Sequence, residues 1–383
     1  MGPMDLRRRS DAGFGLLTAL MVMFALTALG AFGVGLARQE MRAQVRSTTR
    51  TLAFYAAETG LARGMSNWNR PDVPGMGDTW LVDEGTLPGG ASYVVHATQL
   101  DNASTVYALY AIRARGRTRN GVVRAVGLLA ATVPFGSPIT AALKSKDQVR
   151  VRGQAHVDGW DSIPPAWLND CPPEDDGLPG VEMTDMSKMS KSGGAQVDGN
   201  PPQVQNTDTT GWFNFGDVTY EEMTTYADYT LPGGTSVSGS DPAPSLNADG
   251  TCNTSDNTNW GDPLNAGQPC SAWFPIIHVT GNFRGEGSGA GQGILLVDGD
   301  ATFCGGFGFY GPVVIRGAIT SCGSGFKIFG GVVSGSTDID PTGGMFVGDA
   351  QIQYGACVIQ RALSRSRGSK PKPLIDRGWY SGR

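Results

Sequence analysis

The chain has 383 residues, 56 of them glycine, and a formal net charge of −5 from 30 basic and 35 acidic residues. Glycine at about twice its usual ~7% share excludes an all-helical protein, and 17% charged with 40% hydrophobic residues excludes a fibre or a wholly disordered chain. The negative balance speaks against a nucleic-acid-binding protein, which needs clustered basic residues to contact phosphates.

Acidic residues concentrate in one stretch of the chain. Residues 158–262 hold 18 acidic residues against two lysines, a local balance of −16, so the remainder of the chain carries +11. The six cysteines include no Cys-x-x-Cys pair and the three histidines lie far apart, which gives no support to a zinc or redox motif. An even cysteine count in a glycine-rich chain indicates an oxidising compartment.

The first predicted element is one long helix over residues 14–68. Phe14 to Ala37 are 24 consecutive residues without a charge, which as a helix reach ~36 Å and cross a ~30 Å hydrocarbon core. A cleaved secretory signal has a shorter apolar run of ~7 to 15 residues. Helical spacing then continues to residue 68, giving ~80 Å in all. Two apolar rows carry this continuation: Met41, Val45 and Leu52 form one, and Phe54, Ala57, Leu61, Met65 and Trp68 form the other.

A basic leader precedes this helix. Arg7, Arg8 and Arg9 are followed by Gly13 and the aromatic Phe14, where the apolar run begins. This arrangement resembles type IV pilins and pseudopilins. The resemblance implies that prepilin peptidase cuts between Gly13 and Phe14 and that the new N-terminal residue is methylated. An ordinary signal anchor with a stalk helix is the alternative.

A second signal lies in the outer half of the helix. Residues 56–61 read Ala-Ala-Glu-Thr-Gly-Leu and resemble the signature that closes the N-terminal region of PilX-type minor pilins, with Ala57, Glu58 and Gly60 as matching residues. Major pilins usually carry Glu at the fifth mature position, and Thr18 stands there in this chain. A neutral side chain cannot pair with a neighbouring subunit's N-terminal amine, so we expect a minor component.

The resemblance also implies the partners and the location of the protein. The partners are prepilin peptidase, other pilin subunits and their assembly platform, and the inner membrane. The N-terminus is expected in the cytoplasm and the head in the periplasm or on the cell surface; nucleic acid is not an expected partner. Charge alone leaves the orientation open, because arginines stand on both sides of the apolar run.

Three strands are expected after a loop over residues 69–90. They are 91–100, 105–116 and 122–133, runs rich in β-branched and apolar residues. Asn120-Gly121 between the last two is typical of a type I′ hairpin, which pairs these strands antiparallel. A three-stranded meander needs a cover for its apolar face. The outer half of the long helix is the expected cover.

The C-terminal half repeats with a period of 18 residues. Residues 277–281 read Ile-His-Val-Thr-Gly and align with Leu-Leu-Val-Asp-Gly at 295–299 and Val-Val-Ile-Arg-Gly at 313–317. Short β-branched runs punctuated by glycine at this period predict the coils of a right- or left-handed β-helix.

The limits of this repeat are less regular. Residues 149–157 have the same texture and are the expected first coil, and 332–333 with 345–359 are the expected last ones. Residues 160–272 are acidic, rich in Pro, Asn, Gly and Ser, and lack a period, so we expect an insertion that loops out. Residues 361–383 are basic and are expected to form a solvated tail.

Two disulfides are candidates. Cys304 and Cys322 are one 18-residue coil apart, and strands of adjacent coils lie ~4.8 Å apart, inside the ~4.4 to 6.8 Å Cα separation of a disulfide. Two free thiols in a core ladder are the alternative. Cys252 and Cys270, both within the expected insertion, are the candidates for a local bridge.

Carboxylate pairs are the only candidates for catalysis. Asp298 and Asp300, at i and i+2, would point the same way from a strand, and β-helix polysaccharide enzymes use paired carboxylates as proton donor and assisting group. Asp338 and Asp340 repeat the spacing. Asp beside Gly at a coil corner is more often a turn former, and neither pair recurs on an adjacent coil. We therefore expect no catalytic residue, no cofactor-binding residue and no enzyme.

Calcium is the one metal that the sequence raises. Asn247, Asp249 and Asp256 offer oxygen ligands of the type that calcium uses, but the EF-hand spacing is absent. We expect no bound cofactor, with calcium as the alternative.

These expectations combine into an α+β fold, in which a long transmembrane/pilin helix packs on a small antiparallel meander and a C-terminal β-helix with a long insertion follows. The expected function is that of a minor pilin or pseudopilin-like component of a type IV pilus or a type II secretion-like filament. A membrane-anchored β-helix enzyme acting on polysaccharide and a non-catalytic envelope scaffold are the alternatives. The expected divisions are a leader over 1–13, the helix over 14–68, the meander over 69–135, the β-helix over 136–360 with its insertion over 160–272, and the tail over 361–383.

Overall fold

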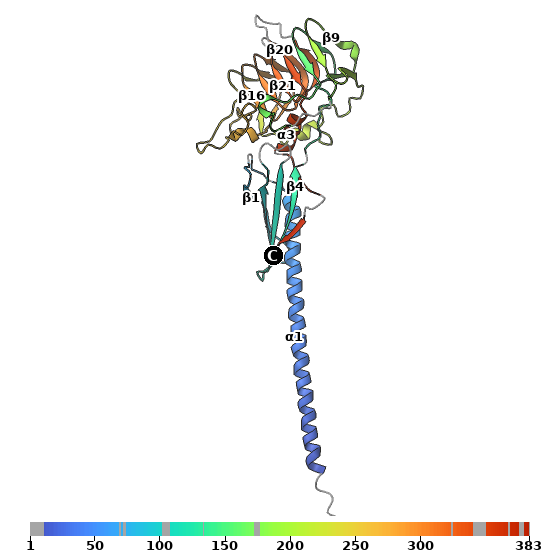
Figure 1. Cartoon of the computed structure of the whole chain (residues 1–383), viewed down its shortest axis with the longest axis vertical. Coiled ribbons are helices and arrows are strands. Elements are labelled where there is room, and N and C mark those ends of the chain that lie inside the picture. Colours follow the sequence, from blue (N-terminus) through green and yellow to red (C-terminus); the bar gives the residue numbers. More distant parts are fainter. Residues whose placement is uncertain are drawn as a thin grey trace, which may run out of the picture.

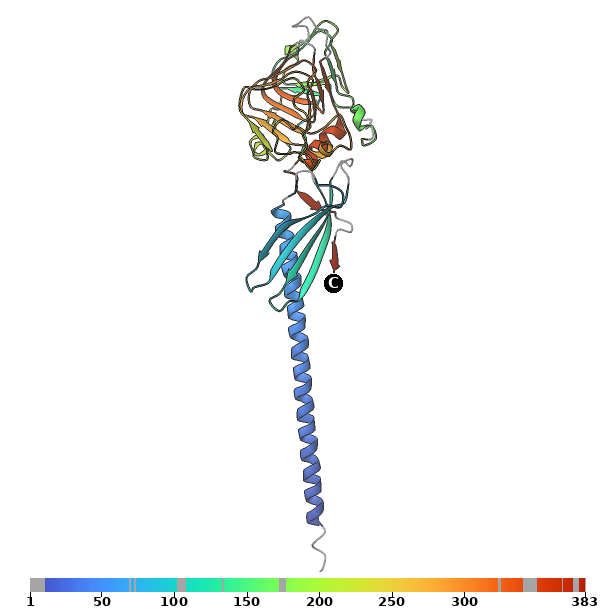
Figure 2. The ribbon, with the colours of Figure 1, turned by 90° about the vertical axis from the view of Figure 1, so that its left-hand side faces the viewer.

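A computed structural model of the chain shows three parts along one axis (Figures 1 and 2). A long helix extends from a small antiparallel sheet, and a larger body of stacked strands, the head, lies beyond the far end of that sheet. We call the helix and the antiparallel sheet together the stalk. The structure describes residues 11–68, 70–71, 74–101, 108–132, 134–171, 177–322, 325–339, 350–366, 368–374 and 379–382.

The helix α1 runs without interruption from Asp11 to Ser66 and has 56 residues. Ala, Leu and Met, which lose little side-chain freedom in a helix, fill much of it, and the chain has no proline between these bounds. At 1.5 Å per residue its length is ~84 Å. The expectation of one continuous helix is confirmed, with ends within three residues of those predicted.

The antiparallel sheet has more strands than the sequence indicated. Four of them form a meander in chain order, and two short C-terminal strands pair with the last of the four. The first strand falls inside the expected loop, because acidic residues and a bulge between Leu81 and Asp83 interrupt its apolar alternation. The strands are β1 (Thr79–Thr86), β2 (Ser92–Gln99), β3 (Leu109–Arg117), β4 (Val123–Thr132), β24 (Pro371–Pro373) and β25 (Trp379–Gly382).

The hairpin between β3 and β4 is antiparallel as predicted, but its turn is of another type. A type I′ turn needs positive φ at both central residues. Only Gly121 has it, with φ of +78°, and Asn120 does not. The Gly121 N–H donates to the Thr118 carbonyl at 2.9 Å, and the Thr118 N–H donates to the Val122 carbonyl at 3.0 Å. Gly121 therefore supplies the one left-handed position of a longer loop.

The head consists of parallel strands that pair at the period seen in the sequence. Leu295 in β17 lies opposite Ile277 in β14 on one side and opposite Val313 in β20 on the other, steps of 18 residues in each case. The strands are β5 (Leu143–Ser145), β6 (Val149–Val151), β7 (His156–Asp158), β8 (Val181–Met183), β9 (Met189–Lys191), β10 (Gln196–Asp198), β11 (Gln203–Gln205), β12 (Tyr229–Leu231), β13 (Thr235–Val237), β14 (Ile276–Val279), β15 (Phe283–Gly285), β16 (Ala290–Gln292), β17 (Ile294–Val297), β18 (Ala301–Cys304), β19 (Gly308–Tyr310), β20 (Val313–Cys322), β21 (Lys327–Phe329), β22 (Val332–Ile339) and β23 (Gln351–Gln353).

The spatial order of the strands differs from their order in the chain. One sheet runs β11-β8-β5-β22-β20-β17-β14-β12. The chain first builds outwards from β5 through β8 to β11, crosses to the opposite end at β12, and stacks back until β22 pairs with β5. The coil expected to be first therefore lies in the middle of the stack, beside the expected last coil.

The segment expected to loop out is part of this stack. Residues 160–272 supply β8 to β11 at one end and β12 with β13 at the other. The strands are only three residues long, and their spacing follows no 18-residue period, so the repeat did not reveal them. The segment also holds α2 (Tyr220–Thr224) and the 3₁₀ turns η1 (Pro165–Trp167), η2 (Met186–Lys188) and η3 (Pro269–Ala272).

The described part of the C-terminal segment forms a helix and two strands and is partly buried, so the expectation of a solvated tail is wrong. Helix α3 spans Ala356–Arg365, and the side chains of Arg361 and Arg365 are each 4% exposed. After α3 the chain returns to the stalk and adds β24 and β25 to its sheet. The head is therefore inserted between β4 and β24. Of the expected last coils, residues 332–333 lie in β22 and residues 351–353 form β23, whereas residues 356–359 belong to α3 and residues 345–349 lie outside the described residues.

Candidate functional site

The lower part of α1, up to Leu52, carries a long exposed apolar surface. Within the described residues, it is the helix that is long and apolar enough to cross a membrane, and its most apolar window is 0% buried. Leu16, Met21 and Phe24, for example, are 71%, 67% and 71% exposed. Surface of this kind needs lipid or another protein around it. Gly13 and Phe14 lie in the first turn of α1, and cleavage between them stays a prediction.

The upper half of α1 is buried against the sheet through small residues. A Cβ added to Gly60 would lie 2.7 Å from the Tyr93 ring, and one added to Gly116 on β3 would lie 2.1 Å from the Ala53 carbonyl oxygen. Backbone therefore approaches backbone where β3 crosses α1. Ala57 and Leu61 are 0% and 1% exposed in the same core. This contact gives a packing reason for most of the Ala-Ala-Glu-Thr-Gly-Leu sequence.

The two apolar rows of the helix have different surroundings. The row that includes Ala57 and Leu61 faces the sheet, and Met65 and Trp68 pack against the same core. The other row, Met41, Val45 and Leu52, is 63%, 59% and 53% exposed. Glu58 is half-buried and forms no ion pair with the residues that the structure describes. The Thr18 hydroxyl donates to the Gly15 carbonyl at 3.0 Å, a local bond within the helix.

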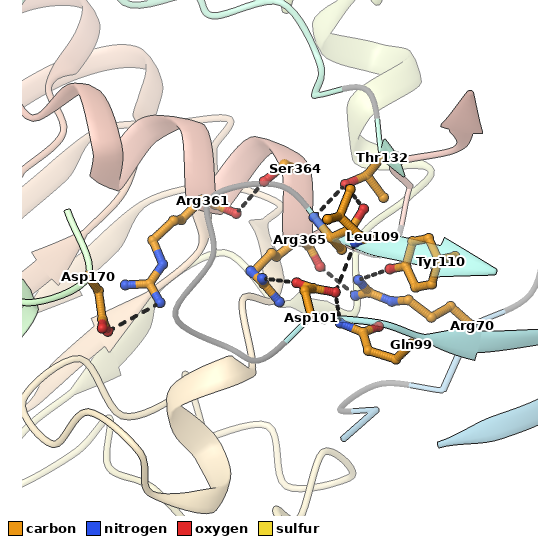
Figure 3. A network of polar contacts seen from close by, with 11 residues as sticks. Arg70, Gln99, Asp101, Leu109, Tyr110, Thr132, Asp170, Arg361, Ser364 and Arg365 are labelled. Atoms are coloured by element: carbon orange, nitrogen blue, oxygen red, sulfur yellow. Dashed lines mark hydrogen bonds and ion pairs between the residues drawn. The ribbon is translucent and has the colours of Figure 1, made fainter. Parts of the chain in front are cut away.

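A buried polar network joins the head to the stalk (Figure 3). The guanidinium of Arg365, at the end of α3, donates to Asp101 Oδ2 at 2.7 Å, and both side chains are almost fully buried. Asp101 Oδ1 accepts from Gln99 Nε2 at 2.6 Å and from the Leu109 N–H at 2.9 Å. Arg70, just past the end of α1, donates to the Arg365 carbonyl. One carboxylate thus holds α3 to the upper end of β2 and β3.

The other side of α3 is fastened to the head. Its apolar residues, Val358 to Leu363, lie in a core with Trp167 and Phe274. Arg361 stands over the Trp167 ring at 4.7 Å and pairs with Asp170 at 3.7 Å. Burial, with the neighbouring Arg365, lowers the pKa of Arg361 to about 10, against the opposing effect of Asp170. A charge this deeply buried is stable only while its partners stay in place.

Three disulfides lie in the head. Cys304 in β18 and Cys322 in β20 stand opposite each other and are bonded, with Cα atoms 4.8 Å apart. Cys252 is bonded to Cys270 with a Cα separation of 5.0 Å. The third bond joins Cys171 to Cys357 and ties the first turn of α3 to the segment after η1. The sequence did not predict this third bond, because its two cysteines are 186 residues apart.

The candidate carboxylates Asp298 and Asp300 have separate structural roles. Asp298 accepts from the Tyr220 hydroxyl at 3.0 Å and pairs with His278 at 3.1 Å. Burial, and then Asp298, raise the pKa of Tyr220. Asp300 Oδ1 accepts from the Ala318 N–H at 2.8 Å, 18 residues further along the chain. The two carboxylates are thus engaged in different bonds and do not converge on a shared group. Asp340 and the side chain of Asp338 lie outside the described residues.

The candidate calcium ligands close local turns. Asp249 Oδ1 accepts from the Thr251 N–H and hydroxyl, and Asp256 Oδ1 does the same with Thr258. The Asn247 side chain donates to the Thr251 hydroxyl at 3.0 Å. Among the residues that the structure describes, no group of three or more His, Cys, Asp and Glu side chains comes together to hold a metal ion.

Comparisons with known proteins give little further guidance. No family model matches the sequence, and no curated protein matches it. Among solved structures, the chain is similar to the competence-associated pilin ComZ from Thermus thermophilus, at 11% identity over 88% of this chain and 98% of that chain, with a TM-score of 0.26. A likeness at this identity and TM-score does not bear on function.

Proposed function

We propose that this protein is a minor pilin or pseudopilin-like subunit, inserted in the inner membrane and assembled into a filament through α1. The observation that carries the proposal is the division of α1. Residues 15–37 are uncharged and exposed, and the upper part of the helix is buried under an antiparallel sheet by Ala53, Ala57 and Gly60. The PilX-like signature lies in this buried contact. Thr18 in place of a carboxylate favours a minor position in the filament.

In this proposal the subunit waits in the membrane with its N-terminus in the cytoplasm and its head in the periplasm. Prepilin peptidase removes residues 1–13, and the assembly platform then extracts the subunit. The exposed row of Met41, Val45 and Leu52 then packs among the helices of other pilin subunits, which replaces lipid and water by protein.

We further propose that the head is a non-catalytic β-helix that serves as a binding or spacing module. The support is the parallel pairing at 18-residue steps and an apolar interior of Val, Ile, Leu and Phe between the sheets. A β-helix enzyme needs several polar groups that converge on one cleft, and Asp298 and Asp300 are instead held in separate bonds. Replacing both by Asn should leave filament assembly intact. Glycan cleavage by the native head that disappears in this variant would favour the anchored enzyme.

The processing step tests the proposal. Gly13→Val places a branched side chain where the peptidase must approach the backbone, so this variant should stay as a membrane-held precursor. Gly30→Val is the matched control, because a Cβ at Gly30 meets nothing within 4 Å, and it should be processed normally. The readout is the intact mass of the chain from isolated membranes. Normal maturation of Gly13→Val would remove the pilin assignment.

A further inference from the structure

Below the sheet, α1 carries four arginines on one side. We call Arg38, Arg42, Arg46 and Arg50 the arginine row; its members are four residues apart, so each step climbs ~6 Å and turns by only ~40°. Steps of three and four residues continue this row into Ala53, Ala57, Gly60 and Gly64, which pack under the sheet. The arginine row therefore lies on the same side of α1 as the sheet. All four arginines are exposed.

The lower end of the sheet carries further arginines, with Arg124 on the α1 side of the sheet and Arg115 and Arg117 on its opposite face. Arg115 and Arg117 end β3, Arg119 lies in the hairpin loop and Arg124 begins β4. The contact between Gly116 and Ala53 places this end of the sheet just above Arg50, and the hairpins point along α1 towards its apolar half (Figures 1 and 2). We call these four residues the lower rim of the sheet.

These eight arginines are not neutralised by ion pairs in the part of the chain that the structure describes. Nearby carboxylates are fewer, and Glu40 is two residues from Arg38, which places it ~200° around the helix. The carboxylate residues of α1 and the four strands of the meander are Asp11, at the start of the helix, and Glu40, Glu58, Asp83 and Glu84. Positive charge is thus concentrated on the sheet side of α1 through the arginine row and Arg124, and Arg115 and Arg117 add charge on the outer face of the lower end of the sheet.

The position of the row relative to the apolar run identifies what can approach it. Arg38 directly follows Ala37, the last residue of that run. The headgroup layer extends ~5 to 7 Å beyond the hydrocarbon core, so Arg38 and Arg42 lie within it. Helical side chains lean towards the N-terminus, and arginine can extend its stem to bring the charge to the interface. Arg46 can therefore reach the layer from ~12 Å above Arg38.

We infer that the arginine row, assisted by the lower rim, is a docking surface for the headgroups of anionic phospholipids. The inference rests on the proposed membrane insertion of α1. Each arginine near an anionic surface strengthens the attraction by about fivefold. The contact holds the unassembled subunit upright, with the sheet at a fixed height above the bilayer. It also gives the arginines a role that the packing of the fold does not.

The test measures which lipids the full-length protein retains. The protein is purified in micelles that contain equal amounts of phosphatidylglycerol and phosphatidylcholine, and native mass spectrometry counts the bound lipids. A variant with Arg38→Gln, Arg42→Gln, Arg46→Gln and Arg50→Gln removes the row. The matched control removes four exposed cations of the head by Lys146→Gln, Lys191→Gln, Arg284→Gln and Lys327→Gln.

We expect the native protein and the head control to bind phosphatidylglycerol at least about tenfold more often than phosphatidylcholine. Two arginines in contact with the headgroups are enough to produce this preference. The row variant should lose this preference. Equal binding of both lipids by the native protein would overturn the inference. If the native protein is nevertheless recovered from membranes with a processed N-terminus, the proposed function still holds. A row variant that keeps the preference for phosphatidylglycerol but fails to assemble would also overturn the inference and would assign the row to an acidic partner protein. Absence of the native protein from membranes would remove both proposals.

Discussion

The stalk and the head are stabilised in different ways. All six cysteines lie in the head, where they form three disulfides, and the stalk has none. The stalk depends on close contact between α1 and the sheet, with Gly60 and Gly116 at the points of nearest approach. Its strands pair mostly with their neighbours in the chain, whereas the head joins segments that are far apart. In the proposed function, α1 leaves the lipid and enters a filament, so it has to stay free of covalent cross-links, whereas the head has no such constraint.

Loss of the disulfide between Cys171 and Cys357 should destabilise the protein most. The double variant Cys171→Ala, Cys357→Ala opens a loop of 186 residues, which in the chain-entropy description costs about 5 kcal/mol of stability. The stalk should keep its own protection. Hydrogen exchange, read separately for peptides of β2 and β3 and for peptides of the head, distinguishes the two regions.

The double variant Cys304→Ala, Cys322→Ala is the control, because it also removes one disulfide of the head. Its loop is only 18 residues, for which the same description gives about 3 kcal/mol. Equal destabilisation of stalk and head by either double variant would mean that the two regions unfold together and are not stabilised separately.

The next effect breaks the joint between the regions. Asp101→Ala leaves Arg365 buried without its carboxylate, and burial already lowers the pKa of that guanidinium. Loss of one partner of a buried pair costs about 3 to 5 kcal/mol. We expect faster exchange in α3 and at the upper ends of β2 and β3, measured by hydrogen exchange.

The control for the joint is Glu84→Ala, an exposed carboxylate on the same sheet, which should change little. Adding Arg365→Met to Asp101→Ala should recover part of the loss, because the unpaired charge is then gone. If Asp101→Ala behaves like Glu84→Ala, the joint does not depend on this ion pair.

A smaller effect is confined to the stalk. Gly116→Ala places a Cβ against the backbone of α1 at Ala53 and Ala57, and overpacking of this kind costs about 1 to 3 kcal/mol. Chemical unfolding can be followed by hydrogen exchange, read separately in peptides of the stalk and of the head. The free energy of unfolding should fall for the stalk and stay unchanged for the head. Ala111→Val on the same strand faces away from α1 and should be tolerated; equal loss in both variants would argue against the close packing.

The smallest effect lies in the head and depends on pH. Tyr220→Phe removes the hydroxyl that donates to Asp298 and should cost about 1 kcal/mol near neutral pH. Burial raises the pKa of Tyr220 in the folded protein, so the unfolded chain loses this proton first as pH rises above its ordinary value of about 10. The contribution of Tyr220 is therefore present below pH ~10 and is lost above it.

Thermal unfolding between pH 8 and 11 measures this prediction. The native head should lose stability more steeply above pH ~10 than the Tyr220→Phe variant. Parallel curves would show that the tyrosine contributes nothing to the alkaline loss.

The sequence predicts contacts that are local or periodic and does not predict those that join distant parts of the chain. The α1 bounds, the β3–β4 hairpin and the 18-residue pairing depend on contacts that are local or periodic, and all three are readable from residue spacing. The order of the coils is not, because β22 meets β5 across almost 190 residues with no repeat to mark the match.

Other features could not be predicted from the sequence, each for a physical reason. In β1 a bulge and acidic residues disturb the alternation of a strand. The contact between Asp101 and Arg365 joins residues 264 positions apart, and a basic C-terminal run looks like a solvated tail until its partners are known. Single ion pairs of this kind leave no pattern in one sequence.

In the proposed function, α1 delivers the subunit into a filament after the leader is removed. Surface filaments sheared from cells and freed of membranes should contain this chain, and the mass of its N-terminal peptide shows whether the leader has been removed. We predict a peptide that begins at Phe14, with the mass of one added methyl group. A chain confined to the membrane fraction with residues 1–13 still attached would contradict the proposal and would favour a permanent membrane anchor.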